Sequence, residues 1–135
     1  MNAIEKINAF LDENPVFYLA TVNNDKPRCR PLGLHLCADG KLFFGVGSFK
    51  DVYRQMVANP YVEITTTNKE GLWLRYSGKA VFEDSYELAE AVIAASPMLA
   101  SIYNEQTGHK LAMFHLEDAV AEFRTPVGVK ETLDL

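Results

Sequence analysis

The sequence predicts a mainly β fold: a six- to seven-stranded antiparallel barrel, closed or nearly closed, with flanking helices. Three observations predict it. Short segments rich in β-branched and aromatic residues recur along the chain, as in VFYLATV, YVEITTT and LWLRYSGKAVF. Short turns such as NNDK, ADGK and NKEG separate them, and such turns join antiparallel neighbours because parallel neighbours need a long crossover. Helical patterns occur only at the start, in the middle and late in the chain.

The first expected element is a helix over residues 3–13. Its apolar residues repeat at helical spacing, and they are Ile4, Ile7, Phe10 and Leu11. Asn2 is placed to cap the first turn, and the pair Asn14-Pro15 ends the helix.

The expected strands follow in order. They are 16–22, Arg28–Cys37, 42–46, 61–67 and 72–82, then 112–116 and 119–124 as two strands or one bent strand, with 128–133 as the candidate for a last one. Gly40 in the ADGK turn is able to adopt the positive φ of a tight hairpin.

Three further helices are expected between the strands. The first covers about residues 50–58 and is stopped by Asn59-Pro60. The second is capped by Asp84 or Ser85 and carries Tyr86, Leu88, Ala89, Val92 and Ile93. The third is a short piece over 98–103, after Ser96-Pro97.

Composition indicates an ordinary globular domain of 135 residues with 48% hydrophobic and 23% charged residues. Thirteen basic and eighteen acidic residues give a net charge of −5, which is unfavourable for binding nucleic acid or anionic lipid. No apolar run approaches the ~20 residues of a membrane-spanning helix, and the acidic start MNAIEKINAFLDEN does not resemble a signal peptide. We therefore expect a cytoplasmic protein that acts on small molecules or other proteins.

The cysteines and histidines do not predict a metal site. Cys29 and Cys37 fall on one expected strand, about 26 Å apart, so we expect two buried or half-buried reduced thiols. There is no CxxC motif, and His35, His109 and His115 are scattered, with no acidic partner at ligand spacing.

The stretch FFGVGSFKDVYRQ raises the question of a phosphate site. It matches neither GxGxxG nor GxxxxGK[ST], so its glycines are also explained by a bend at a strand end. Ser48 and Lys50, however, stand at a helix start, where free N–H groups favour an anion. Arg28 and Arg30 share one strand face with leucines, where an arginine either extends to water or binds an anion. A hairpin through ADGK would bring both ends together.

At these residues the chain resembles the pyridoxamine-phosphate-oxidase-like family of FMN-binding split barrels, in its short bacterial, nitroimidazole-reductase-like branch. The resemblance rests on the order of six segments, which are FYLATV, KPRCRPLGL, DGKLFFG, KDVYRQMVANPYVEI, LWLRYSGKAVFED and FHLEDAVAEF. It implies a split β-barrel and a single FMN-binding domain over 1–135. It also implies a homodimer with FMN at the subunit interface.

The resemblance also implies the site residues. Arg30 matches an arginine that contacts the FMN phosphate. The ring edge would be followed by the backbone of Arg28, Cys29, Arg30, Pro31 and Leu32. The ring and the ribityl chain would pack against Phe44, Gly45, Val46 and Gly47. Ser48 and Lys50 fall in the phosphate-binding turn, and Gln55 matches a glutamine of the next helix. Trp73 and Arg75 match a strand that the second subunit presents to the flavin.

The chain also departs from the family pattern. Val46 and Gly47 stand where hydroxyl residues are usual, which lowers the expected FMN affinity by roughly 1–3 kcal/mol per unmade bond. Asp51, Val52 and His35 replace basic residues of the larger oxidases. The C-terminal FRTPVGVKETLDL lacks the basic and histidine motif of true pyridoxamine phosphate oxidases, so that activity is not expected.

The implied function is an FMN-dependent oxidoreductase that passes hydride or electrons from a reduced nicotinamide to a small acceptor such as a nitro compound or quinone. The alternative is a non-catalytic flavin or other phosphate-ligand binding protein of the same fold, and deazaflavin or haem are further cofactor alternatives. No catalytic residue is assigned. Tyr103, His109 and Lys110 lie in a late loop and are interpreted as surface residues.

Overall fold

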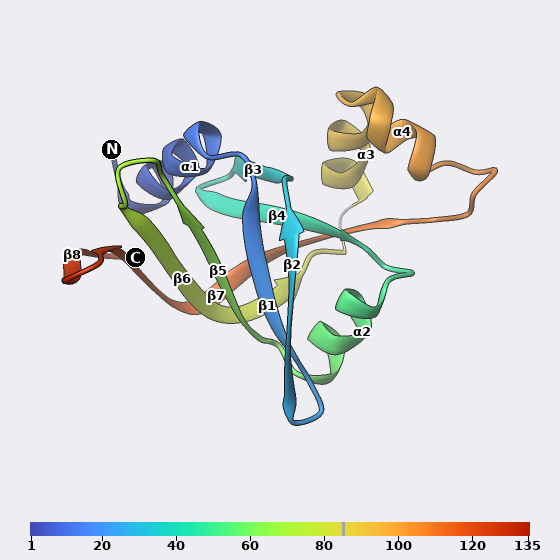
Figure 1. The fold of residues 1–135 in the computed structure, drawn as a ribbon. Helices are drawn as coiled ribbons and strands as arrows, with labels where there is room; N and C mark the ends of the chain where they lie inside the picture. The colour runs from blue at the N-terminus through green and yellow to red at the C-terminus, as the bar shows by residue number, and fades with distance from the viewer. Residues whose placement is uncertain (85) are drawn as a thin grey trace.

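The computed structural model describes residues 1–84 and 86–135, which form four helices and eight strands (Figure 1). In chain order they are α1 (Ala3–Glu13), β1 (Phe17–Asn23), β2 (Lys26–Leu32), β3 (His35–Ala38), β4 (Lys41–Gly47), α2 (Asp51–Ala58), β5 (Tyr61–Thr67), β6 (Trp73–Phe82), α3 (Tyr86–Ala94), α4 (Pro97–Ile102), β7 (Leu111–Thr125) and β8 (Gly128–Leu133). None of the helices in these ranges is long and apolar enough to cross a membrane.

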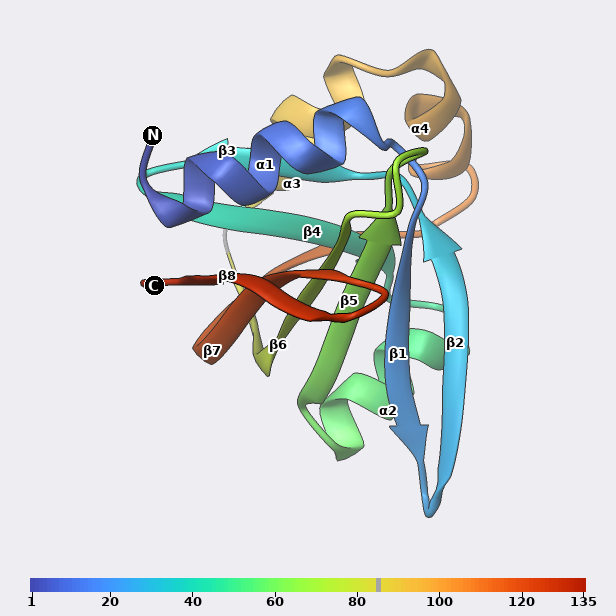
Figure 2. The same cartoon turned by 60° about the vertical axis from the view of Figure 1, so that its left-hand side comes forward.

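The strands form one antiparallel sheet that curls into an open barrel, which confirms the predicted antiparallel barrel with flanking helices but has eight strands in place of six or seven. The order across the sheet is β2-β1-β5-β6-β7-β4-β3, and β8 pairs with β7. Figure 2 shows the curvature, with β1 and β2 on one side and β3 and β4 crossing the top. This arrangement is a split barrel.

The expected strand over Arg28–Cys37 is wrong, because the chain divides at Gly33 and Leu34. Upstream of this point β2 pairs with β1, and downstream β3 pairs with β4, at the opposite end of the sheet order. Pro31 has no N–H to donate, which suits an edge strand that is about to leave the sheet. The division separates the two cysteines onto different edge strands, where both are exposed and free, not buried as expected.

The first helix follows the sequence prediction closely. The Asn2 side chain accepts a hydrogen bond from the Glu5 N–H at 2.9 Å, which satisfies one free donor of the first turn. The apolar stripe is buried against β3 and β4, and Phe10 packs edge-on against Phe123 of β7 at 5.0 Å between ring centres. α1 therefore covers one end of the barrel.

The late part of the chain builds a second, smaller core. Apolar residues of α3 and α4 pack on Phe43 of β4 and on Leu111 and Met113 of β7. Ser96 caps α4, since its Oγ accepts from the Leu99 N–H at 3.3 Å; Ser85, one of two expected caps of α3, lies outside the described residues. The segments 112–116 and 119–124 belong to one strand, β7, of 15 residues.

Candidate functional site

A cleft of about 1110 Å³ lies where the barrel strands meet three of the helices. Its walls are the ends of β2 and β4, the connection at Gly33 and Leu34, the start of α2, the facing sides of α3 and α4, and the first residue of β7. In Figure 1, α2 lies on one side of the β4–α2 corner and α3 and α4 lie on the other. The cleft thus opens at the junction that the stretch FFGVGSFKDVYRQ forms.

One end of the cleft is cationic. Arg30 of β2 and Lys50, the residue before α2, both line it. The Lys50 side chain makes no hydrogen bond that caps α2, and Asp51 and Val52 of the first turn, where helix N–H groups are free, line the cleft. Arginine, lysine and free helix N–H groups are the donors that bind a phosphate.

Arg30 is held in place by three internal hydrogen bonds. Its guanidinium donates to the Leu19 carbonyl at 3.2 Å, to Thr21 Oγ1 at 2.7 Å and to Gln55 Oε1 at 2.8 Å. Thr21 also donates to Gln55 Oε1 at 2.6 Å, which closes a small network between β1, β2 and α2. Burial lowers the pKa of Arg30 from its ordinary value. The guanidinium has more donors than these bonds use, so it still has capacity for an anion.

Arg30 and Lys50 line one cleft, but not through the hairpin that the sequence suggested. β2 and β4 do not pair, so no hairpin joins the arginine end to the Lys50 end. The chain instead passes through Gly33 and Leu34 from β2 to β3, and Arg30, this connection and Lys50 all line the same cleft. Arg28 lies outside the cleft walls, is exposed, and donates to the Pro27 carbonyl at 3.0 Å.

The end of β4 forms the floor. Gly45, Val46 and Gly47 line the cleft, while Phe44 is fully buried in the barrel core. A Cβ at Gly45 would lie 2.5 Å from Leu34 Cδ2 and 2.9 Å from Met113 Sδ, so only glycine fits here without rearrangement. Ser48 bonds the Lys110 carbonyl through its N–H at 2.9 Å and its Oγ at 3.2 Å.

The opposite wall is apolar and comes from α3 and α4. Val92, Leu99 and Ile102 line the cleft together with Leu34 and Val46. These residues were not predicted from the sequence to belong to a site. One signal was available: residues 88–95, LAEAVIAA, are apolar on nearly all sides, which is more than one buried helix face needs.

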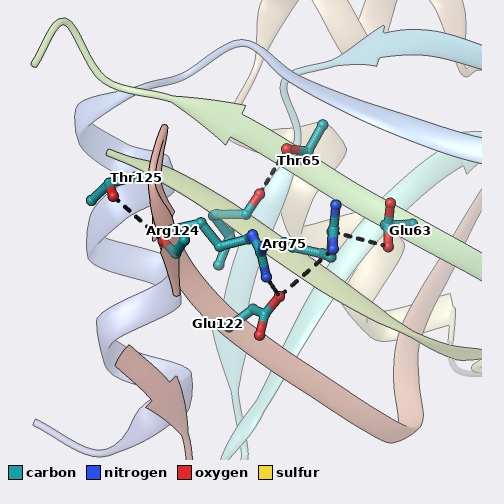
Figure 3. Close-up of polar contacts among 8 residues, drawn as sticks. Glu63, Thr65, Arg75, Glu122, Arg124 and Thr125 are labelled. Atoms are coloured by element: carbon teal, nitrogen blue, oxygen red, sulfur yellow. Dashed lines mark hydrogen bonds and ion pairs between the residues drawn. The ribbon is translucent and has the colours of Figure 1, made fainter. Parts of the chain in front are cut away.

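Trp73 and Arg75 lie on the outer face of β6 and do not line the cleft of their own chain. They alternate with Leu74 and Tyr76, which are buried in the barrel. Figure 3 shows Arg75 between two carboxylates, with 3.7 Å to an oxygen of Glu63 and 3.7 Å to an oxygen of Glu122.

The Trp73 ring itself is covered by two guanidinium groups. Arg75 lies 5.0 Å and Arg124 lies 5.4 Å from the ring centre. Glu122 accepts a hydrogen bond from Arg124 Nη1 at 2.5 Å and so neutralises part of this charge.

Two histidines do have acidic partners, contrary to the sequence interpretation. His35 Nε2 lies 3.2 Å from Asp12 of α1, and its Nδ1 lies 2.7 Å from Asn8 Oδ1. His115 lies between Glu83 at 3.1 Å and Glu117 at 2.9 Å. The sequence could not show the contact of His35 with Asp12 or that of His115 with Glu83, because each joins separate parts of the chain.

Comparisons with known proteins agree with this geometry. The family model described as Pyridoxamine 5'-phosphate oxidase matches residues 3–124. A NimC/NimA family protein from Clostridium acetobutylicum is 34% identical, with a TM-score of 0.86 and coverage of 98% of this chain and 92% of that chain. No curated protein matches the chain.

More distant structures share the fold. General Stress Protein 26 from Bacillus anthracis is 18% identical, with a TM-score of 0.73 and full coverage, 100%, of both chains. HupZ from Group A Streptococcus is 16% identical, with a TM-score of 0.66 and coverage of 94% of this chain and 97% of that chain. The match over 3–124 and the closely similar NimC/NimA structure establish that this chain belongs to the pyridoxamine 5'-phosphate oxidase family.

Proposed function

We propose that this protein is an FMN-dependent oxidoreductase acting on a small molecule, in the manner of a nitroreductase or flavin reductase. One observation carries the proposal: a single cleft joins Arg30, Lys50 and the N-terminus of α2 to a long apolar wall. A flat amphipathic ring with a phosphorylated side chain is the ligand class that this combination favours. The resemblance to a NimC/NimA family protein supports the same reading.

The residues of the cleft fit FMN chemically. Arg30, Lys50 and the free N–H groups of α2 would hold the phosphate, while Val92 and Leu99 would lie against the ring and keep water away from it. When bound, FMN would supply two-electron chemistry that side chains lack. The protein's part would be to bind, orient and shield it.

The polar side chains of the cleft argue that the chemistry comes from a cofactor. They are Arg30, His35, Lys50, Asp51, Ser96 and Tyr103. Ser96 Oγ caps α4 and His35 bonds residues of α1, so within the described residues no nucleophile of this cleft is paired with a base.

The second candidate is a non-catalytic flavin or phosphate-ligand binding protein. Val46 and Gly47 bring no hydroxyl to the cleft floor, and the Asp51 carboxylate lines its cationic end. Both features weaken phosphate binding and favour a carrier or sensor role over tight cofactor retention.

Titration of FMN into the purified protein tests the proposal. We expect quenching of FMN fluorescence and a raised melting temperature, because a ligand that binds the folded state stabilises it. Lys50→Ala and Arg30→Ala should each weaken binding about tenfold or more, as expected for lost charge-assisted bonds. Lys130→Ala, on β8, is the control and should bind as the wild type does. Absence of FMN binding by the wild type would reject the proposal.

Oxidation of reduced nicotinamide then separates the enzyme from the binding protein. With FMN bound, an oxidoreductase consumes the nicotinamide when a nitro compound or quinone is added. A protein that binds FMN but shows no turnover with any acceptor of the panel supports the non-catalytic candidate.

We also infer a homodimer in which the second copy contributes to each cleft, and a cytoplasmic protein that binds neither nucleic acid nor membrane. Trp73 and Arg75 support the first inference, because the family resemblance assigns them to the flavin site and they do not line the cleft of their own chain. The net charge of −5 supports the second.

A further inference from the structure

Tyr103 is buried and lines the cleft, although the sequence was interpreted as placing it on the surface. It follows α4 directly, and its N–H bonds the Leu99 carbonyl at 2.8 Å. Only 8% of the residue is exposed, and it packs within the cluster that α3 and α4 form with β4 and β7. It also lines the cleft.

The Tyr103 hydroxyl has no protein partner among the described residues. Among the residues that the structure describes, three side-chain nitrogen atoms are fully buried and have no hydrogen-bond partner. They are Arg75 Nε, His115 Nδ1 and Arg124 Nε. The Tyr103 hydroxyl is not among these fully buried atoms, so its oxygen retains some exposed surface. Because Tyr103 lines the cleft, we take this surface to adjoin the cleft. Burial raises the pKa of Tyr103, so the group is a neutral donor at physiological pH. A buried tyrosine hydroxyl normally finds a partner.

Neighbouring residues fix where this hydroxyl lies. A Cβ at Gly47 would come within 2.9 Å of the hydroxyl oxygen and within 2.7 Å of Phe49 Cε1. The Phe49 ring is held from its other side by His109, stacked at 3.7 Å between ring centres and 18° between planes. Lys50 Nζ lies 5.8 Å from the centre of the same Phe49 ring. The hydroxyl is therefore packed over the backbone of Gly47, close to the cationic end.

Tyr103 also borders the apolar wall, since Leu99 and Ile102 of α4 precede it and line the cleft with it. It is thus the polar group at the junction between the cationic end and the apolar wall. In a ligand with a phosphate at one end and a flat ring at the other, this junction faces the chain that connects them.

We propose that the Tyr103 hydroxyl is a ligand-contacting residue, which hydrogen-bonds an oxygen of the polyol chain between the phosphate and the ring of a flavin. This inference rests on the proposed function, because it takes a flavin phosphate as the occupant of the cleft. It assigns a specificity role: the cleft favours planar ligands with a hydroxylated linker over planar ligands without one.

Three flavin compounds and two matched variants test the assignment. FMN has ring, polyol chain and phosphate, riboflavin lacks the phosphate, and lumiflavin has the same ring with a methyl group in place of the polyol chain. Tyr103→Phe removes only the oxygen and keeps the packed ring. Tyr53→Phe is the control, because Tyr53 packs on Phe82 outside the cleft. Equilibrium dissociation constants are measured by fluorescence, and thermal melting without ligand checks that each variant is folded.

We expect Tyr103→Phe to weaken the binding of FMN and of riboflavin by about five- to tenfold, the effect of one lost hydrogen bond. It should leave lumiflavin binding and the ligand-free melting temperature unchanged. Lys50→Ala should show the complementary pattern, with loss for FMN and none for riboflavin.

The possible failures are distinguishable. If the wild type binds none of the three compounds, the proposed function fails and this inference fails with it. If the wild type binds FMN and Tyr103→Phe binds it equally well, the proposed function stands and the Tyr103 assignment is overturned. An equal loss for all three compounds also overturns it, because the contact would then be to the ring.

Discussion

At the scale of single residues, Gly47 shows why the glycines of FFGVGSFKDVYRQ are glycines. The sequence allowed a phosphate-binding turn or a bend at a strand end, and it could not show which side chains lie against the glycine. In the structure a Cβ at Gly47 would meet Phe49 at 2.7 Å and the Tyr103 hydroxyl at 2.9 Å. The absent side chain makes room for two residues of the cleft.

Gly47→Ala should therefore damage the cleft as well as the fold. Because Phe49 and Tyr103 must both shift, we expect the free energy of unfolding to fall by about 1–3 kcal/mol and FMN affinity to fall with it. Gly33→Ala is the control, since its added Cβ would have only one neighbour, at an ordinary 3.7 Å. Urea unfolding of both variants measures the difference, and equal stabilities would contradict this explanation.

At the scale of elements, local signals predicted what local interactions determine. α1 begins and ends where its cap and Asn14-Pro15 indicated, because these contacts lie within a few residues. The prediction of one strand over Arg28–Cys37 was wrong because strand pairing is not local: β2 and β3 have partners at opposite ends of the sheet. The cleft wall from α3 and α4 was missed for the same reason, since it exists only after the barrel closes.

The start of α2 allows a prediction about charge. The Asp51 carboxylate lies in the first turn, where the helix favours an anion, and it pairs with Arg54. It competes for the position that a ligand phosphate would take. Asp51→Asn should strengthen FMN binding about two- to fivefold, while the helix loses roughly 0.3–1 kcal/mol of stabilisation. Asp25→Asn, in the turn between β1 and β2, should change neither quantity. Weaker FMN binding by Asp51→Asn would place the phosphate elsewhere.

His35 joins α1 to β3 and makes this contact sensitive to pH. Its side chain is 9% exposed and faces Asn8 and Asp12 of α1 and the Phe17 ring of β1. Burial lowers the pKa of His35 below its ordinary value of 6.5, although Asp12 opposes the shift. The folded state thus binds a proton less readily than the unfolded state.

The sign of the effect follows from this difference. The stability contributed by the neutral ring is fully present above about pH 6.5 and is lost as the pH falls through the lower pKa of the folded protein. Between pH 7.5 and 5 the wild type should therefore lose more unfolding free energy than His35→Gln, which cannot take up a proton. Urea titrations at each pH measure both; parallel losses would mean that other groups cause the acid sensitivity.

At the scale of the whole molecule, the structure contains two hydrophobic cores. The barrel core holds the strands and α1, and the smaller cluster fastens α3 and α4 to β4 and β7. The cleft lies between them, so its rigid cationic end belongs to the barrel and its apolar wall to the smaller cluster. The cationic end was predicted from the arginines and the lysine of the sequence. The apolar wall is visible only in the assembled fold.

Trp73 and Arg75, implied as site residues by the family resemblance, do not line the cleft of their own chain. A homodimer with shared sites would explain this, and subunit mixing tests it. Lys50→Ala and Trp73→Ala should each bind FMN weakly as separate dimers. When the two are unfolded and refolded together, half of the dimers are mixed, and each mixed dimer carries one intact cleft, so about a quarter of all sites should recover. A mixture of Lys50→Ala with Arg30→Ala should recover none, because both residues line the cleft of the same chain. A monomeric mass by light scattering, or no recovery in the first mixture, would contradict the shared site.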